Sequence, residues 1–449
     1  MRLQCHITRM MLTAVAATAM MLAGCTVHPA GERQQLQAAR RLGEAYKAPF
    51  AHRRQPPLPA AATPRELVAW GLRNNPAVEA AYWNWVQALD YVPQAGTQAT
   101  APMLNAGAAI NSGSVSAAGT TLGLSNMTGA DIQWPGKLDA QARAALARAG
   151  AAEEVFLQRR FAARRDILLA YNRWAWRVAS DELLLQTHTL IKAMRAFAVA
   201  DVQVGQMNTD ELLKTQERLA QHRILMAQLA YACREDRYKL NEVLGRDVHA
   251  PMHRPTTIAV PRLGVLSIRT LVTLALKHNA ALHGLNKQIA AARQDLLRAK
   301  MHYIPNFDVG AATSLDGLMQ NVSGALVLPW IKYEAFNAAI AQARAEIAAA
   351  SAELRSQQLD IGTRLAVDVQ MIRSDRAQLR LFEHRVLPRL NEMLLLVRAR
   401  YQTGSGSAAD QLNIQMSQLD TRQAMLDLQR QIADRVADLD AIVDGKVER

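Results

Sequence analysis

The sequence predicts a mainly α-helical protein with a small β part, in which one unit of strands and a long helical hairpin occurs twice. The first observation is a repeat: residues 63–75 return as 267–279, with Arg, Leu, Val, Leu and Asn identical at a fixed offset. The second is a pair of stretches suited to long helices, 136–204 without proline and 331–403 with Pro388 alone. A short extended segment pair precedes each. A period of this length is not that of a solenoid repeat, so the fold contains two copies of a large unit.

Residues 1–24 have the features of a bacterial signal peptide. Two arginines precede an apolar run over residues 10–22, which is too short for a membrane-spanning helix. The sequence Leu-Ala-Gly-Cys25 that follows resembles the bacterial lipobox, which implies cleavage before Cys25 and lipid on its sulfur and amine. Because Thr26 and not Asp comes next, the lipobox rule implies sorting to the outer membrane. The alternative is an ordinary signal peptide with an incidental cysteine.

Residues 25–62 are expected to form a lipidated N-terminal tether, because they are polar and then rich in proline and alanine. The mature chain has one further cysteine, Cys233, so no intrachain disulfide is expected. Cys233 lies in an apolar helical stretch, which favours a buried and inert thiol over a reactive one. Loss of the signal peptide lowers the formal net charge from +13 to +11. The positive residues are dispersed along helices, which favours solvated helix faces over a nucleic-acid surface.

Each repeat is predicted to begin with a helix, over 63–98 and 267–303. Thr63 is a suitable N-cap, with Pro64 in the first turn and Glu66 three residues on. The predicted strands that follow are 104–111 and 128–134, then 306–314 and 321–328.

Four strands cannot close a barrel, and open strand edges are not tolerated in lipid. If these strands enter a membrane, several chains must therefore share one barrel. Trp134 and Trp330 lie where strands end and are expected to be interfacial anchors.

Apolar residues recur every seven positions in the second long stretch, which is typical of a coiled-coil seam. They are Ile340, Ile347, Leu354 and Ile361, then Leu365, Ile372, Leu379 and Val386. Gly205 and Gly404 mark the hairpin turns, and a return helix of about 36 residues, roughly 54 Å long, follows each. The return helix and the helix that opens each repeat together match one long helix. The pattern predicts α-helical hairpins with a membrane end and a tip.

With this order of elements, residues 63–443 resemble the TolC-type family of outer-membrane efflux proteins. The resemblance rests on Leu72-Arg-Asn-Asn75-Pro and its copy Leu276-Lys-His-Asn279-Ala, on the paired strands, and on Tyr401-Gln-Thr-Gly404 followed by Asp410-Gln-Leu. It implies two efflux-protein repeats, 63–262 and 263–449. It also implies a homotrimer with a shared twelve-stranded transmembrane β-barrel in the outer membrane and a trimeric α-barrel tunnel across the periplasm. The implied partners are a periplasmic adaptor (membrane fusion) protein and an inner-membrane pump of the RND type.

The resemblance further implies that Tyr401 and Asp410 narrow the periplasmic aperture. Three-fold symmetry would make Asp410 a ring of three carboxylates, which attracts cations. Family members often carry a second Asp where Asn413 stands and an Arg where Gly406 stands. The alternative for Asp410 is a carboxylate that only stabilises a helix start. Asp210, in the other turn, is a weaker candidate.

Catalytic, metal and cofactor sites are not predicted. The 11 histidines include no His-x-x-x-His pair with an acidic third ligand, and the methionines form no Met-x-x-Met cluster. Neither a phosphate-binding loop nor a nucleophile elbow is present. The chain is therefore not expected to be an enzyme.

The function that the resemblance implies is an efflux channel anchored by lipid in the bacterial outer membrane. Its cargo is heavy-metal cations or organic drugs; residues 75–83 and 134–137 look similar to the metal-efflux branches of the family. A type I protein-secretion conduit is an alternative within the same architecture. A lipid-anchored periplasmic coiled-coil scaffold without a pore is an alternative of another class, and it has no use for the strands.

Overall fold

A computed structural model describes residues 26–53, 57–59, 61–98, 103–111, 114–125, 132–205, 208–255, 257–258, 260, 267–314, 320–326, 328–403, 405 and 407–444. The chain divides into two compact units. The strand unit comprises Met1–Glu44, Ala81–Phe156 and Ala281–Ser356, and the hairpin unit comprises Ala45–Ala80, Leu157–Ala280 and Gln357–Arg449. Each unit therefore takes segments from both sequence repeats. Cys25 and the signal peptide lie outside the described residues.

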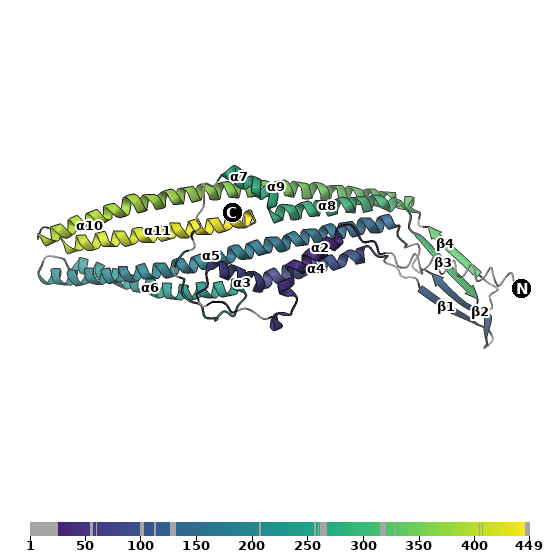
Figure 1. The fold of residues 1–449 in the computed structure, drawn as a ribbon, viewed down its shortest axis with the longest axis horizontal. Coiled ribbons are helices and arrows are strands. Elements are labelled where there is room, and N and C mark those ends of the chain that lie inside the picture. The colour runs from purple at the N-terminus through teal and green to yellow at the C-terminus, as the bar shows by residue number, and fades with distance from the viewer. Residues whose placement is uncertain are drawn as a thin grey trace. The chain divides into compact units, whose positions relative to one another are not determined.

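The strand unit combines a four-stranded sheet with helical segments (Figure 1). Its helices are α2 (Glu32–Leu42), most of α4 (Pro76–Ala95) and of α8 (Ala280–Lys300), and the first parts of α5 (Pro135–Gln203) and α9 (Tyr333–Leu381). Its strands are β1 (Met103–Asn111), β2 (Ser114–Ser125), β3 (Phe307–Ser314) and β4 (Gln320–Leu326). The spatial order is β1-β2-β3-β4 and every neighbouring pair is antiparallel, so both repeats contribute one hairpin to one sheet.

Three of the four predicted strands are confirmed, and the second is tested only at its last three residues. Residues 114–125, which lie between the first two predicted strands, form β2. Of the predicted strand 128–134, residues 128–131 lie outside the described residues, and Ile132 makes only an isolated bridge to Phe307. Small residues fit an extended backbone that pairs on both sides, so the ladder hydrogen bonds with β1 and β3 outweigh the low strand propensity of this stretch.

The hairpin unit consists of helices. They are α3 (Pro64–Asn74), the second part of α5, α6 (Thr209–Leu244), α7 (Ile268–His278), the second part of α9, α10 (Leu387–Gln402) and α11 (Ala408–Ile442). Figure 1 shows α10 beside α11 and the end of α5 beside α6 as two antiparallel hairpins. None of the helices among the described residues is long and apolar enough to cross a membrane.

The helix expected over 63–98 is two helices, α3 and α4, and the helix expected over 267–303 is likewise divided into α7 and α8. Asn75 causes the first break. Its backbone is extended and its N–H ends α3 on the carbonyl of Gly71, while its Oδ1 accepts from the N–H groups of Ala77 and Val78 at 2.9 and 3.2 Å. One residue thus ends one helix and caps the next, as Asn does well.

The same asparagine also joins the opening helices to the end of the return helix. Nδ2 of Asn75 donates to the carbonyl of Val243 at 2.7 Å, and Nδ2 of Asn279 donates to that of Ile442 at 2.8 Å. Both carbonyls belong to the last turn of a return helix, where no intrahelical donor remains. This contact explains why the two copies share an asparagine at this position.

The second long stretch is interrupted at Pro388. Residues Phe382–Val386 form a π-helical turn between α9 and α10. Proline lacks an N–H and its ring would clash with the carbonyl four residues earlier, and one widened turn accommodates it. The predicted seven-residue stripe is confirmed as buried at three of its eight positions: Leu365 and Ile372 are fully buried and Ile361 is 6 % exposed. The other five are half-buried in the single chain.

Each unit has its own core. In the strand unit, Trp85 is fully buried and stacks on Phe156 at a centroid distance of 5.8 Å, with the edge of Tyr82 against both rings. The hairpin unit buries Leu67 and Trp70 of α3 against α5 and α6. As expected from their spacing, Trp83 faces away from Trp85 and is 48 % exposed.

The segment expected to be a tether is more ordered than a flexible linker. Within it, α2 packs in the strand unit: Ala39 is buried and accepts a hydrogen bond from the hydroxyl of Tyr82 at 3.3 Å. Val27 donates its N–H to the carbonyl of Gly96 at 3.0 Å. The chain is therefore fixed to the residue that follows α4, within two residues of Cys25.

Candidate functional site

The turn between α10 and α11 is held by hydrogen bonds to the carbonyl of Arg400. The N–H of Ser405 and the hydroxyls of Thr403 and Ser405 all donate to it, at 3.0, 3.0 and 3.2 Å. Ser407 caps α11 by accepting from the N–H of Ala409 at 3.0 Å. These bonds satisfy groups that a helix end leaves without partners, so this tip is a defined turn. Gly404 lies outside the described residues.

The structure places Tyr401 and Asp410 on either side of this turn. Tyr401 is in the last turn of α10 and is 49 % exposed, and Asp410 is an exposed residue in the first turn of α11. Because Ser407 already caps the helix, the carboxylate of Asp410 is not needed as a cap. It remains on the surface beside a positive helix end.

The turn between α5 and α6 has a different construction. Gly205 has a φ of 74° and donates its N–H to the carbonyl of Val202 at 3.1 Å, which ends α5 in a left-handed residue. Asn208 precedes α6 without a side-chain cap, and Asp210 is exposed in the first turn. Both hairpin turns lie at the same end of the hairpin unit (Figure 1). Tyr401 and Asp410 thus lie at the α10–α11 turn, and Asp210 lies at the α5–α6 turn.

The strand registers give the sheet two chemically different faces. Directly opposed residues share a face and neighbours along a strand alternate. Leu122 opposes Ala106, and Phe307 opposes Leu326, all on one face. The other face carries Thr121 opposite Ser314, Gly123 opposite Ala312, Ala312 opposite Asn321, and Asp308 opposite Ala325. One face therefore carries Leu122, Phe307 and Leu326, and the other carries small and polar residues with one carboxylate.

A compact set of contacts joins the end of the sheet to the start of α5. Trp134 packs against Phe307 at a centroid distance of 5.0 Å and donates its indole N–H to the carbonyl of Pro305 at 2.7 Å. The ammonium of Lys137 is buried and donates to the carbonyl of Ile304 at 2.7 Å and to Oδ1 of Asn306 at 2.6 Å. Burial lowers the pKa of Lys137. Trp134 remains 43 % exposed, which suits an amphipathic ring at a membrane surface.

A model of the outer membrane efflux protein family matches residues 71–246 and, separately, 271–445. The chain belongs to this family. The two matches lie within the predicted repeats 63–262 and 263–449, whose own bounds stay predictions. The family consists of outer-membrane efflux channels and not of enzymes. A comparison with curated protein sequences gives no match.

Solved structures of outer-membrane proteins share the fold of this efflux protein. A membrane protein from Pseudomonas aeruginosa is 18% identical with a TM-score of 0.71, covering 85% of this chain and 91% of its own. VceC from Vibrio cholerae is 19% identical with a TM-score of 0.68, covering 86% and 97%. The open MtrE channel of Neisseria gonorrhoeae is 17% identical with a TM-score of 0.67, covering 86% and 90%. Identities this low bear on the fold alone.

Sequence reasoning missed an ion-pair and hydrogen-bond seam along α11 of this efflux protein. Asp440 pairs with Arg164 of α5 at 2.8 Å, and Arg435 pairs with Asp375 of α9 at 3.3 Å. Burial raises the pKa of Asp434, whose carboxylate also pairs with Arg430 at 2.8 Å. Arg430 and Asp434 are four positions apart, which was a usable signal for their ion pair. The pairs that Arg435 and Asp440 make with other helices had no local signal.

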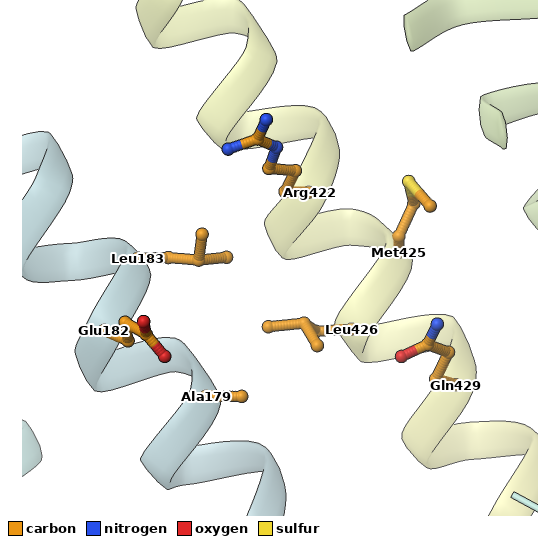
Figure 2. A pocket seen from close by; sticks show the side chains of 7 residues that line it. All are labelled: Ala179, Glu182, Leu183, Arg422, Met425, Leu426 and Gln429. Carbon is orange, nitrogen blue, oxygen red and sulfur yellow. The ribbon is translucent and has the colours of Figure 1, made fainter. Parts of the chain in front are cut away.

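An apolar groove lies between α5 and α11, with a volume of about 290 Å³ (Figure 2). Leu183 and Leu426 face one another across it, and the charged side chains of Glu182 and Arg422 also line it. Ala179, Met425 and Gln429 complete the lining. Nothing in its chemistry selects a small molecule.

A metal site with three or more ligands and a reactive thiol both lack support among the described residues. Within the described part of the chain, His, Cys, Asp and Glu side chains do not gather in groups of three or more that could hold a metal ion. Cys233 is half-buried, and burial raises the pKa of its thiol, as expected for an unreactive cysteine.

Proposed function

We propose that this outer-membrane efflux protein works as a homotrimer, the channel component of a tripartite system with a periplasmic adaptor and an inner-membrane pump of the RND type. The observation that carries the proposal is the two-faced sheet with β1 and β4 at its edges. An edge strand exposes unpaired N–H and C=O groups, which lipid does not tolerate. Pairing β4 of one copy with β1 of the next removes every edge when the sheet closes on itself.

The two faces of the sheet support the same proposal. In a transmembrane barrel the outer face is apolar and the inner face is polar. Leu122 and Leu326 are 44 % and 62 % exposed in the single chain and would contact lipid. Asp308 and Asn321 would then line the lumen. Three copies give twelve strands, and the helical hairpins would continue the lumen as a periplasmic tunnel. A coiled-coil scaffold without a pore would not need this sheet.

We further propose heavy-metal cations as the cargo, in preference to organic drugs or secreted proteins. Residues 75–83 and 134–137 look similar to the metal-efflux branches of the family, which supports this cargo. Asp308 on the polar face of the sheet also supports it. Carboxylates along a lumen favour cations. Single-channel recording in planar lipid bilayers tests both proposals: the purified protein should conduct and prefer cations. Absence of conductance contradicts the channel, and anion preference contradicts the cargo.

Replacing Asp410 with Ala is expected to weaken cation selectivity and block by divalent cations. Three-fold symmetry would bring three copies of this carboxylate to the periplasmic aperture, where they would concentrate cations. Tyr401→Phe is expected to raise the open fraction if its hydroxyl bonds to a neighbouring helix. The free energy of unfolding should change little in Asp410→Ala, since a carboxylate at a helix start contributes about 0.3–1 kcal/mol.

Asp210→Ala, at the other hairpin turn, is the matched control for Asp410→Ala. The proposal requires a smaller change in selectivity from Asp210→Ala. If Asp410→Ala conducts like the parent chain, Asp410 only stabilises its helix, and Asp210 becomes the next candidate for the aperture.

Cys25→Ala is expected to give a protein that is exported without lipid. The proposed lipidation forms on the sulfur and amine of Cys25, and an acyl anchor adds to membrane binding without spanning the bilayer. Trimer assembly should survive, because the sheet itself inserts. Metabolic labelling with a fatty acid measures the difference; label that persists in the variant contradicts lipidation at Cys25.

A further inference from the structure

Two histidines face one another between the helices of the first hairpin. His188 of α5 and His222 of α6 have ring centroids 5.7 Å apart and an interplanar angle of 23°. They lie 34 positions apart in the sequence, so no local sequence motif indicates that they form a pair. Both belong to the hairpin unit, and neither has a role in the channel proposed above.

The ring nitrogens of this pair have unused capacity for a ligand. His222 is only 6 % exposed. Both of its ring nitrogens, together with Nδ1 of His188, are buried without a hydrogen-bond partner. Buried polar atoms in proteins nearly always have partners, and each exception needs an explanation. A neutral imidazole without a partner is also a ready metal ligand.

The surroundings lower the pKa of both rings. Burial lowers the pKa of His188, and the positive charges of Lys192 and Arg223 lower it further. Burial also lowers the pKa of His222, as does the neighbouring His188. The same two cationic side chains oppose a bound cation, so the binding is expected to be reversible.

The spacing of the rings also fits a shared ion. Imidazole nitrogens bind Zn²⁺ at about 2.0–2.1 Å in a tetrahedral arrangement, which places two ligating rings with centroids roughly 5–6 Å apart. The observed 5.7 Å falls in this range. Imidazole is a favoured ligand of Zn²⁺ and Cu²⁺, and carboxylate-preferring Mg²⁺ and Ca²⁺ are poor matches.

We propose that His188 and His222 together bind one Zn²⁺ or Cu²⁺ ion and thereby join α5 to α6. The described residues supply no third His, Cys, Asp or Glu at this point, so water completes the coordination. A site with open positions exchanges its ion more readily than a closed structural site. The ion would stabilise the first hairpin, whatever cargo the channel carries.

The test uses the full-length protein in detergent, free of a histidine tag and stripped of metal. Zn²⁺ should raise the melting temperature, and Cu²⁺ should give an electron paramagnetic resonance spectrum with coupling to two nitrogens. Loss even of an outer-sphere partner commonly weakens metal binding 10- to 100-fold, so His188→Gln or His222→Gln should weaken it by at least about tenfold. His384→Gln, at an exposed histidine of the π-helical turn, should bind like the parent chain.

Three results of this test would contradict the shared metal site. An equal melting shift in His222→Gln and in the parent chain overturns the proposal, as does a Cu²⁺ spectrum without nitrogen coupling. If His222→Gln fails to fold because the ring is deeply buried, His188→Gln decides the matter, since His188 is only half-buried. Retained affinity in His188→Gln then contradicts the shared site.

Discussion

Leu122→Arg is expected to abolish insertion of the assembled protein into the outer membrane. Leu122 lies on the apolar face of β2, an inner strand of the sheet, and is 44 % exposed in the single chain. An arginine on the lipid face of a transmembrane barrel costs about 2–4 kcal/mol near the bilayer midplane. A trimer carries the substitution three times, so the penalty acts three times on one insertion event. Membrane fractionation and heat-modified mobility of the protein measure the loss.

Thr121→Arg is the matched control, because it places the same side chain one residue earlier on the opposite face. Thr121 opposes Ser314 and Gly107 on the polar face, which would line the water-filled lumen. This variant should insert, with altered conductance. Equal loss of insertion in both variants would mean that the two faces of the sheet are not exposed to different environments, lipid on one side and water on the other.

Trp85→Ala is expected to lower the free energy of unfolding by about 3–5 kcal/mol, the range for removing a fully buried aromatic side chain. The indole is fully buried and stacks on Phe156 of α5, so its removal leaves a cavity between α4 and α5 and loses the contact with Tyr82. Urea denaturation followed by circular dichroism measures the change in midpoint.

Trp83→Ala provides the comparison for this core. Trp83 is the same residue type on the same helix but is 48 % exposed, so its removal should cost much less. A similar cost for both variants would show that Trp83 is buried in the assembled protein, for example against another copy.

Features that repeat along the chain could be predicted from the sequence. The long helices and the buried part of the heptad stripe follow from periodicity, and the turn at Gly205 follows from a residue that tolerates positive φ. The break at Asn75 was not predicted, because apolar periodicity continues through it. Asn75 caps the next helix and also bonds to the carbonyl of Val243, and this second contact joins segments far apart in the sequence.

The features that escaped sequence reasoning depend on contacts between distant segments. Strand β2 has little intrinsic strand propensity and exists because β1 and β3 pair with it. The His188–His222 pair joins two helices that only the hairpin brings together. Conversely, the identity of Tyr401 and Asp410 as tip residues followed from the family resemblance. The aperture that they are proposed to form depends on neighbouring copies, which a single chain does not contain.

The mass of the detergent-solubilised assembly tests the central claim most directly, because the shared sheet requires a fixed number of copies. Native mass spectrometry, combined with cross-linking between cysteines placed on β1 and β4, is expected to give three chains and a bond from β4 of one copy to β1 of the next. A stable monomer whose strands resist protease, or cross-links formed only within one chain, would contradict the shared channel.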